Sequence, residues 1–276
     1  MVESPRLKIT YEQIRHIKGS KITNAFGTSY KKYGIDLIGY TIRKIWYMGK
    51  YIFIYLIHHD KPSYIARTHS MMYGKILINS VPLNPKLKPF MTWELESGDT
   101  VRWYMAQVTI FDPISETCTI KSNYGSFCAK EIIERAVGMM AYDISHERFD
   151  RALLVKRIED CWNEIKEDIL TDLLLDQRFF PGVGNILQQE ALYRCRLLPG
   201  KTVQKAGTTG VDCLIDALSE VIDALYQSYT DKRDGLQYGP IFQIYHKAYC
   251  PLGHKTITKY LGYHNRRTTW CPICQK

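Results

Sequence analysis

The pattern of apolar residues changes near residue 130, and this change limits the chain to a fold with two unlike parts. Before it, short runs rich in β-branched and aromatic residues are broken by glycine, proline and polar turns; after it, apolar residues recur every three or four positions. The first pattern is typical of strands and the second of amphipathic helices. We therefore predict an α+β, multidomain chain with an N-terminal β-sandwich and a helical second half.

Individual elements follow from the same patterns. The expected strands fall within residues 35–57, 64–78, 92–95, 100–111 and 117–122, after a helix at about residues 11–18. Helical stripes run from Ile158 to Leu173 and from Leu214 to Leu225, and a shorter helix begins near Ile186. The tail is small, basic, aromatic and cysteine-bearing. We predict three domains, at residues 1–135, 136–240 and 241–276.

Basic residues are concentrated at the two ends of the chain. The chain has 37 lysines and arginines against 28 acidic residues, a net charge of +9. Residues 1–50 carry a net +7 and residues 241–276 a net +6, whereas the residues between them are net −4. Lysines that only keep a surface soluble would explain the total but not this placement. Two basic ends suggest a polyanion as partner.

The sequence shows neither a membrane span nor a secretion signal. No run of about 18 apolar residues is present, and the N-terminus lacks a charged segment followed by a hydrophobic one. We expect an intracellular protein, nuclear if eukaryotic and otherwise cytoplasmic or viral, with no membrane partner. Its eight cysteines are then expected to be thiols or metal ligands and not disulfides. Five show no ligand spacing, and we interpret them as packing residues: Cys118, Cys128, Cys161, Cys195 and Cys213.

The tail has the ligand spacing of a metal site. Three residues lie between Cys250 and His254, two lie between Cys271 and Cys274, and 16 residues separate the pairs. Two turns with this spacing can present four ligands tetrahedrally, as Zn²⁺ prefers, and a filled shell makes one structural zinc ion. His264 or His246 could replace His254, and chance clustering is the rival explanation. The segment between the pairs is expected to form a β-hairpin with Arg266 and Arg267 near its return strand.

A glycine-rich turn precedes the helix expected near Ile186. Gly182, Gly184 and Asn185 lie in "FFPGVGNILQQEALY". Backbone N–H groups at a helix start favour a phosphate oxygen, and the Asn185 amide could add a contact. Such a segment is more often only a turn. The basic finger that follows makes DNA contact the better interpretation.

These pieces together resemble a known family. "MVE", "GKY", "HSMMYG", "LLLDQRFFPGVGNILQQEALYR" and "NRRTTWCPICQ" occur in the order seen in the formamidopyrimidine-DNA glycosylase and endonuclease VIII (Fpg/Nei) family of base-excision-repair enzymes. The resemblance spans residues 2–276. The valine start and the Cys-His-Cys-Cys finger are similar to the eukaryotic endonuclease VIII-like branch. The resemblance implies a helix–two-turn–helix domain and a β-hairpin zinc finger.

The resemblance also implies a catalytic role for the chain start, which is otherwise a frayed end. Once Met1 is removed, the Val2 α-amine would attack C1′ of the damaged nucleoside, expel the base and leave a Schiff base from which strand cleavage by elimination follows. An α-amino group titrates near about 7.7 to 8.0, so part of it is neutral at physiological pH. Glu3 would handle protons at the sugar, and Lys50 would contact phosphate and assist catalysis. Alone, Glu3 would be a solvated acid and Lys50 an ordinary turn lysine.

Further residues of the family's DNA contacts are matched. His69 corresponds to a phosphate-contacting histidine and Met72 to the methionine that fills the gap left by a flipped base, with a core position as its rival explanation. Arg266 corresponds to the finger arginine that grips the phosphate of the flipped nucleotide, and Arg267 is a close competitor. A base must leave the duplex before its sugar is attacked, so such clamps are physically reasonable.

Two departures from the family pattern affect the expected substrate. Valine supplies a primary amine where the family commonly uses proline. The bacterial family usually inserts an arginine and a phenylalanine from a loop as a pair against the opposite strand. We do not find that pair in "VRWYMAQVTIFDPISE". We therefore expect a monomeric, bifunctional DNA glycosylase and AP lyase that prefers oxidised bases in single-stranded or bubble DNA. The alternative is a non-catalytic zinc-finger DNA-binding protein, which would need neither Val2-Glu3 nor Lys50.

Overall fold

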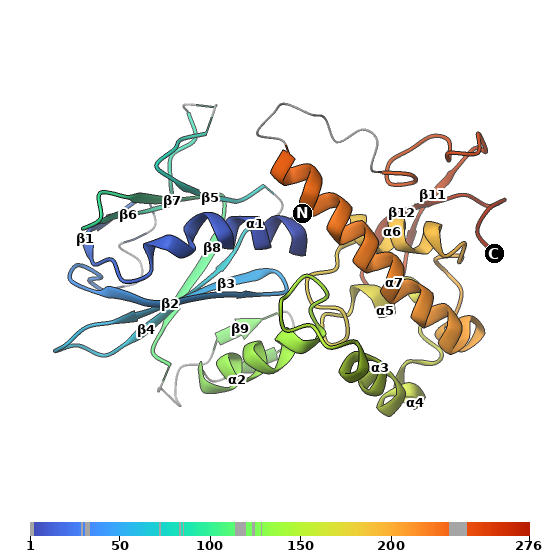
Figure 1. Ribbon diagram of the computed structural model, residues 1–276, viewed down its shortest axis with the longest axis horizontal. Coiled ribbons are helices and arrows are strands. Elements are labelled where there is room, and N and C mark those ends of the chain that lie inside the picture. Colours follow the sequence, from blue (N-terminus) through green and yellow to red (C-terminus); the bar gives the residue numbers. More distant parts are fainter. Residues whose placement is uncertain are drawn as a thin grey trace. The chain divides into compact units, whose positions relative to one another are not determined.

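The computed structural model consists of two compact units (Figure 1). The β unit comprises Leu7–Gly138, and the helical unit comprises Glu3–Arg6 and Met139–Lys276. The structure describes residues 3–28, 30, 34–71, 73–82, 84, 86–113, 120–122, 125–127, 129–231 and 242–276.

The β unit contains two four-stranded antiparallel sheets, which confirms the predicted sandwich. One sheet has the order β1-β6-β7-β5 and the other β2-β3-β4-β8. Their strands are β1 (Ile22–Phe26), β2 (Thr41–Met48), β3 (Tyr51–Ile57), β4 (Tyr64–His69), β5 (Lys75–Ile78), β6 (Met91–Leu95), β7 (Thr100–Tyr104) and β8 (Gln107–Phe111). A two-stranded sheet, β9 (Ile120–Ser122) and β10 (Gly125–Phe127), precedes helix α2 (Ala129–Met139).

Side chains from both sheets share one core. Trp93 and Trp103 are fully buried on neighbouring strands, with ring centroids 4.6 Å apart. Helix α1 (Ser4–Ile14) adds Leu7 and Ile14 to this core. Large aromatic side chains dominate the energy of such a core because each removes a wide apolar area from water.

The sequence predicted the strands better than their boundaries. The run at residues 64–78 forms two strands, β4 and β5, which belong to different sheets. Gly74 lies between them, where a Cβ would come within 2.3 Å of the Ser70 carbonyl oxygen. The first helix begins at Ser4 and not near residue 11, and β1 was not predicted.

The helical unit contains most of the remaining helices. They are α3 (Arg151–Asp160), α4 (Trp162–Ile165), α5 (Leu170–Leu175), α6 (Asn185–Arg194) and α7 (Val203–Thr230). The stripe from Ile158 to Leu173, predicted as one helix, is divided among α3, α4 and α5. Gly207, with φ of 65°, interrupts the helical geometry inside α7. Figure 1 shows α6 beside α7, and their apolar faces share a core.

The predicted β-hairpin of the tail is confirmed. Strand β11 (Ile257–Leu261) pairs antiparallel with β12 (Arg266–Trp270). β12 also lies against α6. No helix among the described residues is long and apolar enough to cross a membrane.

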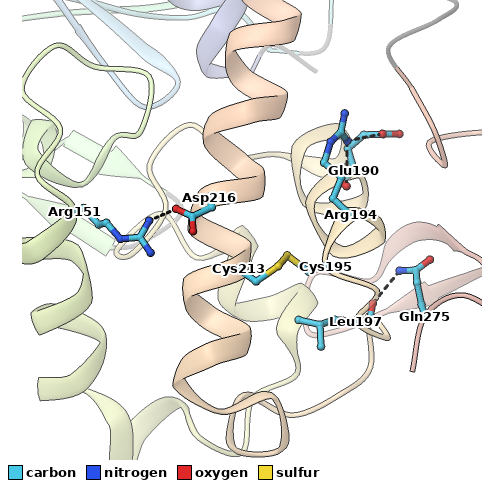
Figure 2. The surroundings of a disulfide bond; sticks show 8 residues. All are labelled: Arg151, Glu190, Arg194, Cys195, Leu197, Cys213, Asp216 and Gln275. Carbon is cyan, nitrogen blue, oxygen red and sulfur yellow. Dashed lines mark hydrogen bonds and ion pairs between the residues drawn. A yellow bond between two sulfur atoms is a disulfide. The ribbon is translucent and has the colours of Figure 1, made fainter.

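A disulfide joins Cys195, at the C-terminal end of α6, to Cys213 in α7 (Figure 2). The interpretation of these two cysteines as unpaired packing residues is therefore wrong. Their spacing did not indicate this bond, because disulfide connectivity cannot be deduced from sequence positions alone. Cys161 is a free thiol, and Cys118 and Cys128 lie outside the described residues.

Candidate functional site

The carboxylate of Glu3 is buried at the start of α6. Its two oxygens accept hydrogen bonds from the backbone N–H groups of Ile186, at 2.9 Å, and Leu187, at 3.0 Å. These N–H groups have no partner inside the helix, and the helix dipole favours a negative charge at this end. Only 5% of Glu3 is exposed, and the two hydrogen bonds hold its carboxylate in one orientation.

The glycine-rich turn allows this close approach. A Cβ on Gly184 would lie 2.5 Å from Glu3 Oε1, so any side chain at this position would displace the carboxylate. The sequence predicted that a phosphate oxygen would face the N–H groups at this helix start. For Ile186 and Leu187 that prediction is wrong, because Glu3 occupies both.

The backbone next to Glu3 is also fixed. The Ser4 N–H donates to the Gly182 carbonyl at 3.1 Å, and its hydroxyl donates to Asp143 at 3.4 Å. Val2, the predicted nucleophile, directly precedes Glu3 and lies outside the described residues.

Asn185, the first residue of α6, is turned toward the finger. Its side-chain N–H donates to the carbonyl of Arg267 at 2.9 Å, while its Oδ1 accepts a hydrogen bond from Gln188 at 3.2 Å. Gln189 makes further bonds to β12. The predicted phosphate contact at Asn185 would therefore use the second N–H of the same amide.

The two finger arginines are not equivalent. Arg266 pairs with Leu261 and Arg267 with Tyr260 in the hairpin, and successive residues of a strand point to opposite faces. Arg266 is half-buried and Arg267 is exposed. Burial, together with the charge of Arg267, lowers the pKa of His246 below its usual value. One phosphate would thus meet one of the arginines and not both.

Lys50 and His69 lie close together in the β unit. Lys50 follows Gly49 in the two-residue turn between β2 and β3, where Met48 pairs with Tyr51. Gly49 has a φ of 58°, which a two-residue hairpin turn requires and glycine accepts readily. Tyr51 is in turn the strand partner of His69, and their ring centroids are 5.1 Å apart.

His69 is held as a neutral imidazole. Burial, with the nearby charges of Lys50 and Arg67, lowers its pKa from 6.5 to about 4. Its Nδ1 accepts the Met71 backbone N–H at 3.2 Å, so the proton of the neutral ring is on Nε2. The ring can therefore donate one hydrogen bond to an anionic oxygen. Met72 lies outside the described residues.

Four side chains of the tail form a cluster that could hold a metal ion. Cys250, His254, Cys271 and Cys274 place their ligand atoms within 4.8 Å of one another. The Cys250 and Cys274 sulfurs are 3.9 Å apart, and His254 Nδ1 is 3.7 Å from the first and 3.2 Å from the second. His254, and neither His246 nor His264, belongs to the cluster.

These distances fit one tetrahedral ion. Bonds of about 2.3 Å to sulfur and about 2.0 Å to nitrogen put the corners of a zinc tetrahedron roughly 3.5 to 3.8 Å apart. The backbone supports the cluster: the Cys250 N–H donates to the His254 carbonyl at 3.0 Å, and the Cys271 N–H donates to Gln275 Oε1 at 2.8 Å. With four protein ligands, the coordination shell has no place for an activated water.

Sequence reasoning missed the polar side chains of α6 that organise the unit. Glu190 is fully buried, and its carboxylate accepts the backbone N–H groups of Gln243, Ile244 and Tyr245 at 2.9 to 3.0 Å. It also bonds Arg194 at 3.1 Å, as Figure 2 shows. The available signal was a run of three polar residues, Gln188 to Glu190, between the apolar pairs Ile186-Leu187 and Ala191-Leu192 of α6.

Another missed residue anchors the tip of the finger. Asp172 in α5 is buried and accepts the Tyr263 backbone N–H at 2.9 Å, next to Gly262. Burial raises the pKa of Asp172 above its usual value, and this hydrogen bond opposes the rise.

Comparisons with known proteins agree with this arrangement. The family model for the formamidopyrimidine-DNA glycosylase H2TH domain matches residues 140–230. An endonuclease 8-like protein of Acanthamoeba polyphaga mimivirus is 48% identical over 275 residues, covering 100% of both chains. The chain belongs to the Fpg/Nei family.

Solved structures support the same assignment. The crystal structure of a viral DNA glycosylase matches with a TM-score of 0.93 and 47% identity over 100% of both chains. The Lactococcus lactis formamidopyrimidine-DNA glycosylase, bound non-covalently to DNA with an AP site, matches with a TM-score of 0.71 and 18% identity over 99% of both chains. At that identity the second match shows the Fpg/Nei fold alone. The assignment makes the chain a DNA glycosylase of base-excision repair.

Proposed function

We propose that the protein is a bifunctional DNA glycosylase and AP lyase that removes oxidised bases through a Schiff base at the Val2 amine. The observation that carries the proposal is the placement of Glu3. A carboxylate one residue from the expected nucleophile is buried and held by two backbone N–H groups of α6. A frayed terminus would leave such an acid in solvent.

The proposed reaction begins with removal of Met1. The neutral Val2 amine attacks C1′, the bond from C1′ to the base breaks, and the base leaves with the electron pair and takes up a proton. The nitrogen then loses a proton, its lone pair forms the C1′=N bond as the C1′–O4′ bond breaks, and O4′ takes up a proton, which gives the ring-opened Schiff base. Removal of the 2′ hydrogen then expels the 3′ phosphate by β-elimination, and δ-elimination can follow.

Glu3 is assigned the proton transfers at the sugar. General acid–base catalysis contributes about 10²- to 10⁴-fold when the group is within hydrogen-bond reach. Two N–H donors fix the carboxylate, and the covalent link to Val2 keeps it next to the amine.

Binding of damaged DNA is assigned to both units. Lys50 would meet phosphate with its charge, and His69 would donate one hydrogen bond from neutral Nε2. Asn185 and a finger arginine would hold the backbone on the other unit, and Met72 would fill the gap of the flipped base. Phosphate contacts position the duplex before the base is attacked.

The finger is assigned one structural zinc ion, held by Cys250, His254, Cys271 and Cys274. Bound zinc would supply folding stability and no reaction step, because four protein ligands complete its shell.

Borohydride trapping tests the proposal. The protein would be incubated with an oligonucleotide carrying one abasic site or one oxidised pyrimidine, and then reduced. We expect a covalent adduct that maps to Val2 by mass spectrometry and is absent when an additional residue precedes Val2. Glu3→Gln should lower base excision by at least about 100-fold. Glu134→Gln is the matched control, since Glu134 is exposed on α2.

The absence of any adduct from processed, zinc-loaded protein would contradict the proposal. Retained DNA binding in that case would support the alternative, a non-catalytic zinc-finger DNA-binding protein. An adduct at a lysine would contradict only the assignment of Val2 as the nucleophile and would leave the Schiff-base chemistry standing.

We also propose a preference for single-stranded or bubble DNA. The basis is the missing pair of arginine and phenylalanine in the segment that includes β8. Excision from the same lesion in single-stranded, bubble and duplex oligonucleotides measures the preference. Equal rates on all three would contradict it.

A further inference from the structure

We propose that Gln189 is a positioning residue that sets the finger arginines against the DNA backbone. Its side-chain amide binds the free edge of β12 and fixes the register of the hairpin on α6. This inference rests on the proposed function and adds a residue on which tight substrate binding depends.

The side chain of Gln189 binds two backbone groups of one strand. Its Oε1 accepts the Thr269 N–H at 2.8 Å, and its Nε2 donates to the Arg267 carbonyl at 3.2 Å. The Nε2 also donates to the Asn185 carbonyl at 2.9 Å, and only 1% of the residue is exposed. The N–H and C=O that flank Thr268 are the groups that one residue of a parallel neighbouring strand would bond. Gln189 therefore takes the place of a third strand.

This contact lies beside the arginines that are expected to meet phosphate. Arg267 supplies the bonded carbonyl itself, and Arg266 is the residue before it. The other edge of β12 pairs with β11, so both edges of the strand are held. Moving β12 by a fraction of an ångström would move both guanidinium groups, and charge-assisted bonds to phosphate depend on such geometry.

Glu3 does not depend on this side chain. Its carboxylate is held by backbone N–H groups of Ile186 and Leu187, at the start of the same helix. Loss of the Gln189 amide should therefore weaken DNA binding while leaving the chemical step intact.

Two substitutions remove hydrogen bonds of Gln189, one with an added negative charge and one without. Gln189→Glu keeps an oxygen acceptor for Thr269 but places a second oxygen against the Arg267 and Asn185 carbonyls. Gln189→Met has a similar size, adds no charge and removes both bonds. Gln204→Glu is the matched control, because Gln204 is exposed on α7 and the change in charge is the same.

The experiment measures kcat and KM on an oligonucleotide with one abasic site, together with DNA affinity at several salt concentrations. For Gln189→Glu and Gln189→Met we expect KM to rise about tenfold, which is about 1.4 kcal/mol, with kcat within about twofold of wild type. The slope of log affinity against log salt should fall by about one, as for a lost phosphate contact. Gln204→Glu should match wild type in slope and kcat.

Zinc content and the melting temperature identify variants that fail to fold, and Gln189→Met decides the question if Gln189→Glu does not fold. Unchanged KM and salt slope in a folded, zinc-loaded variant would overturn the inference. A fall in kcat with unchanged KM would overturn it as well. Wild-type protein that forms no Schiff base would instead reject the proposed function, and the DNA affinities would still test Gln189.

Discussion

Glu3 Oε1 accepts the backbone N–H of Ile186 at 2.9 Å, although 183 residues separate the two in the chain. The glycine-rich turn before α6 therefore makes room for this carboxylate, a role other than binding phosphate. The start of this helix holds an acid of the protein itself. The same helix binds β12 through Asn185 and Gln189. One rigid element therefore orients the proposed proton-transfer group and the finger.

Gly184→Ala should inactivate the protein without unfolding it. The new Cβ would lie 2.5 Å from Glu3 Oε1, and the flexible side chain of Glu3 can move where the helix backbone cannot. Because the carboxylate leaves its position, we expect kcat for base excision to fall by about 100-fold with KM nearly unchanged. Single-turnover kinetics on an oxidised pyrimidine would measure the effect.

Gly200→Ala is the control for that substitution. Nothing lies within 4 Å of a Cβ at Gly200, and its φ is not positive. Its activity should equal that of wild type. Full activity of Gly184→Ala would show that the position of Glu3 does not matter for the reaction.

The second prediction concerns pH. The pKa of His69 is about 4 in the folded protein and 6.5 when unperturbed, so the folded state binds this proton more weakly than the unfolded chain. Stability from this group is therefore complete above about pH 6.5 and falls as the pH drops toward 4. Denaturant unfolding at several pH values should show a smaller acid loss for His69→Gln than for wild type.

Removal of the Lys50 charge should raise the pKa of His69, because that charge opposes protonation. Lys50→Met, followed by titration of the imidazole by NMR, would measure the shift. Lys75→Met is the control, since Lys75 is exposed on β5 and is not among the charges that lower this pKa. No difference between the two variants would contradict the proximity of Lys50 and His69.

The third prediction tests the metal cluster. The purified protein should contain about one zinc ion, and His254→Gln should lose it, because the shell needs all four ligands. His264→Gln should keep the metal. Elemental analysis measures zinc, and DNA affinity after chelation measures its effect. Metal-free protein that binds DNA like the holoprotein would argue against a role for the finger in DNA binding.

The sequence was sufficient where the signal was local. Ligand spacing predicted the four cluster residues, although it left His246 and His264 open until the cluster geometry selected His254. Strand composition predicted the sandwich, because β-branched and aromatic runs depend on neighbouring residues. The turn lysine, Lys50, was also placed correctly between two strands.

Contacts between distant residues could not be predicted in this way. The Glu3 contact to α6 joins segments 183 residues apart, and no local pattern reports an acid that caps another segment's helix. The division of the Ile158 to Leu173 stripe followed from turns that the apolar spacing does not show. Gln189 and Glu190 were given no role from the sequence, yet the fold buries both against backbone groups.

The fourth prediction concerns the disulfide between Cys195 and Cys213. It closes a segment with a sequence separation of 18, so its removal should lower the free energy of unfolding by about 3 kcal/mol through the entropy of the unfolded chain. Guanidinium unfolding of a Cys195→Ser, Cys213→Ser double variant would measure this, with Cys161→Ser as the control for loss of a free thiol. Because the bond lies at the C-terminal end of α6 and Glu3 at its start, kcat at 25 °C should stay within about twofold of wild type. Equal unfolding midpoints for the double variant and wild type would show that the bond adds no stability to the helical unit.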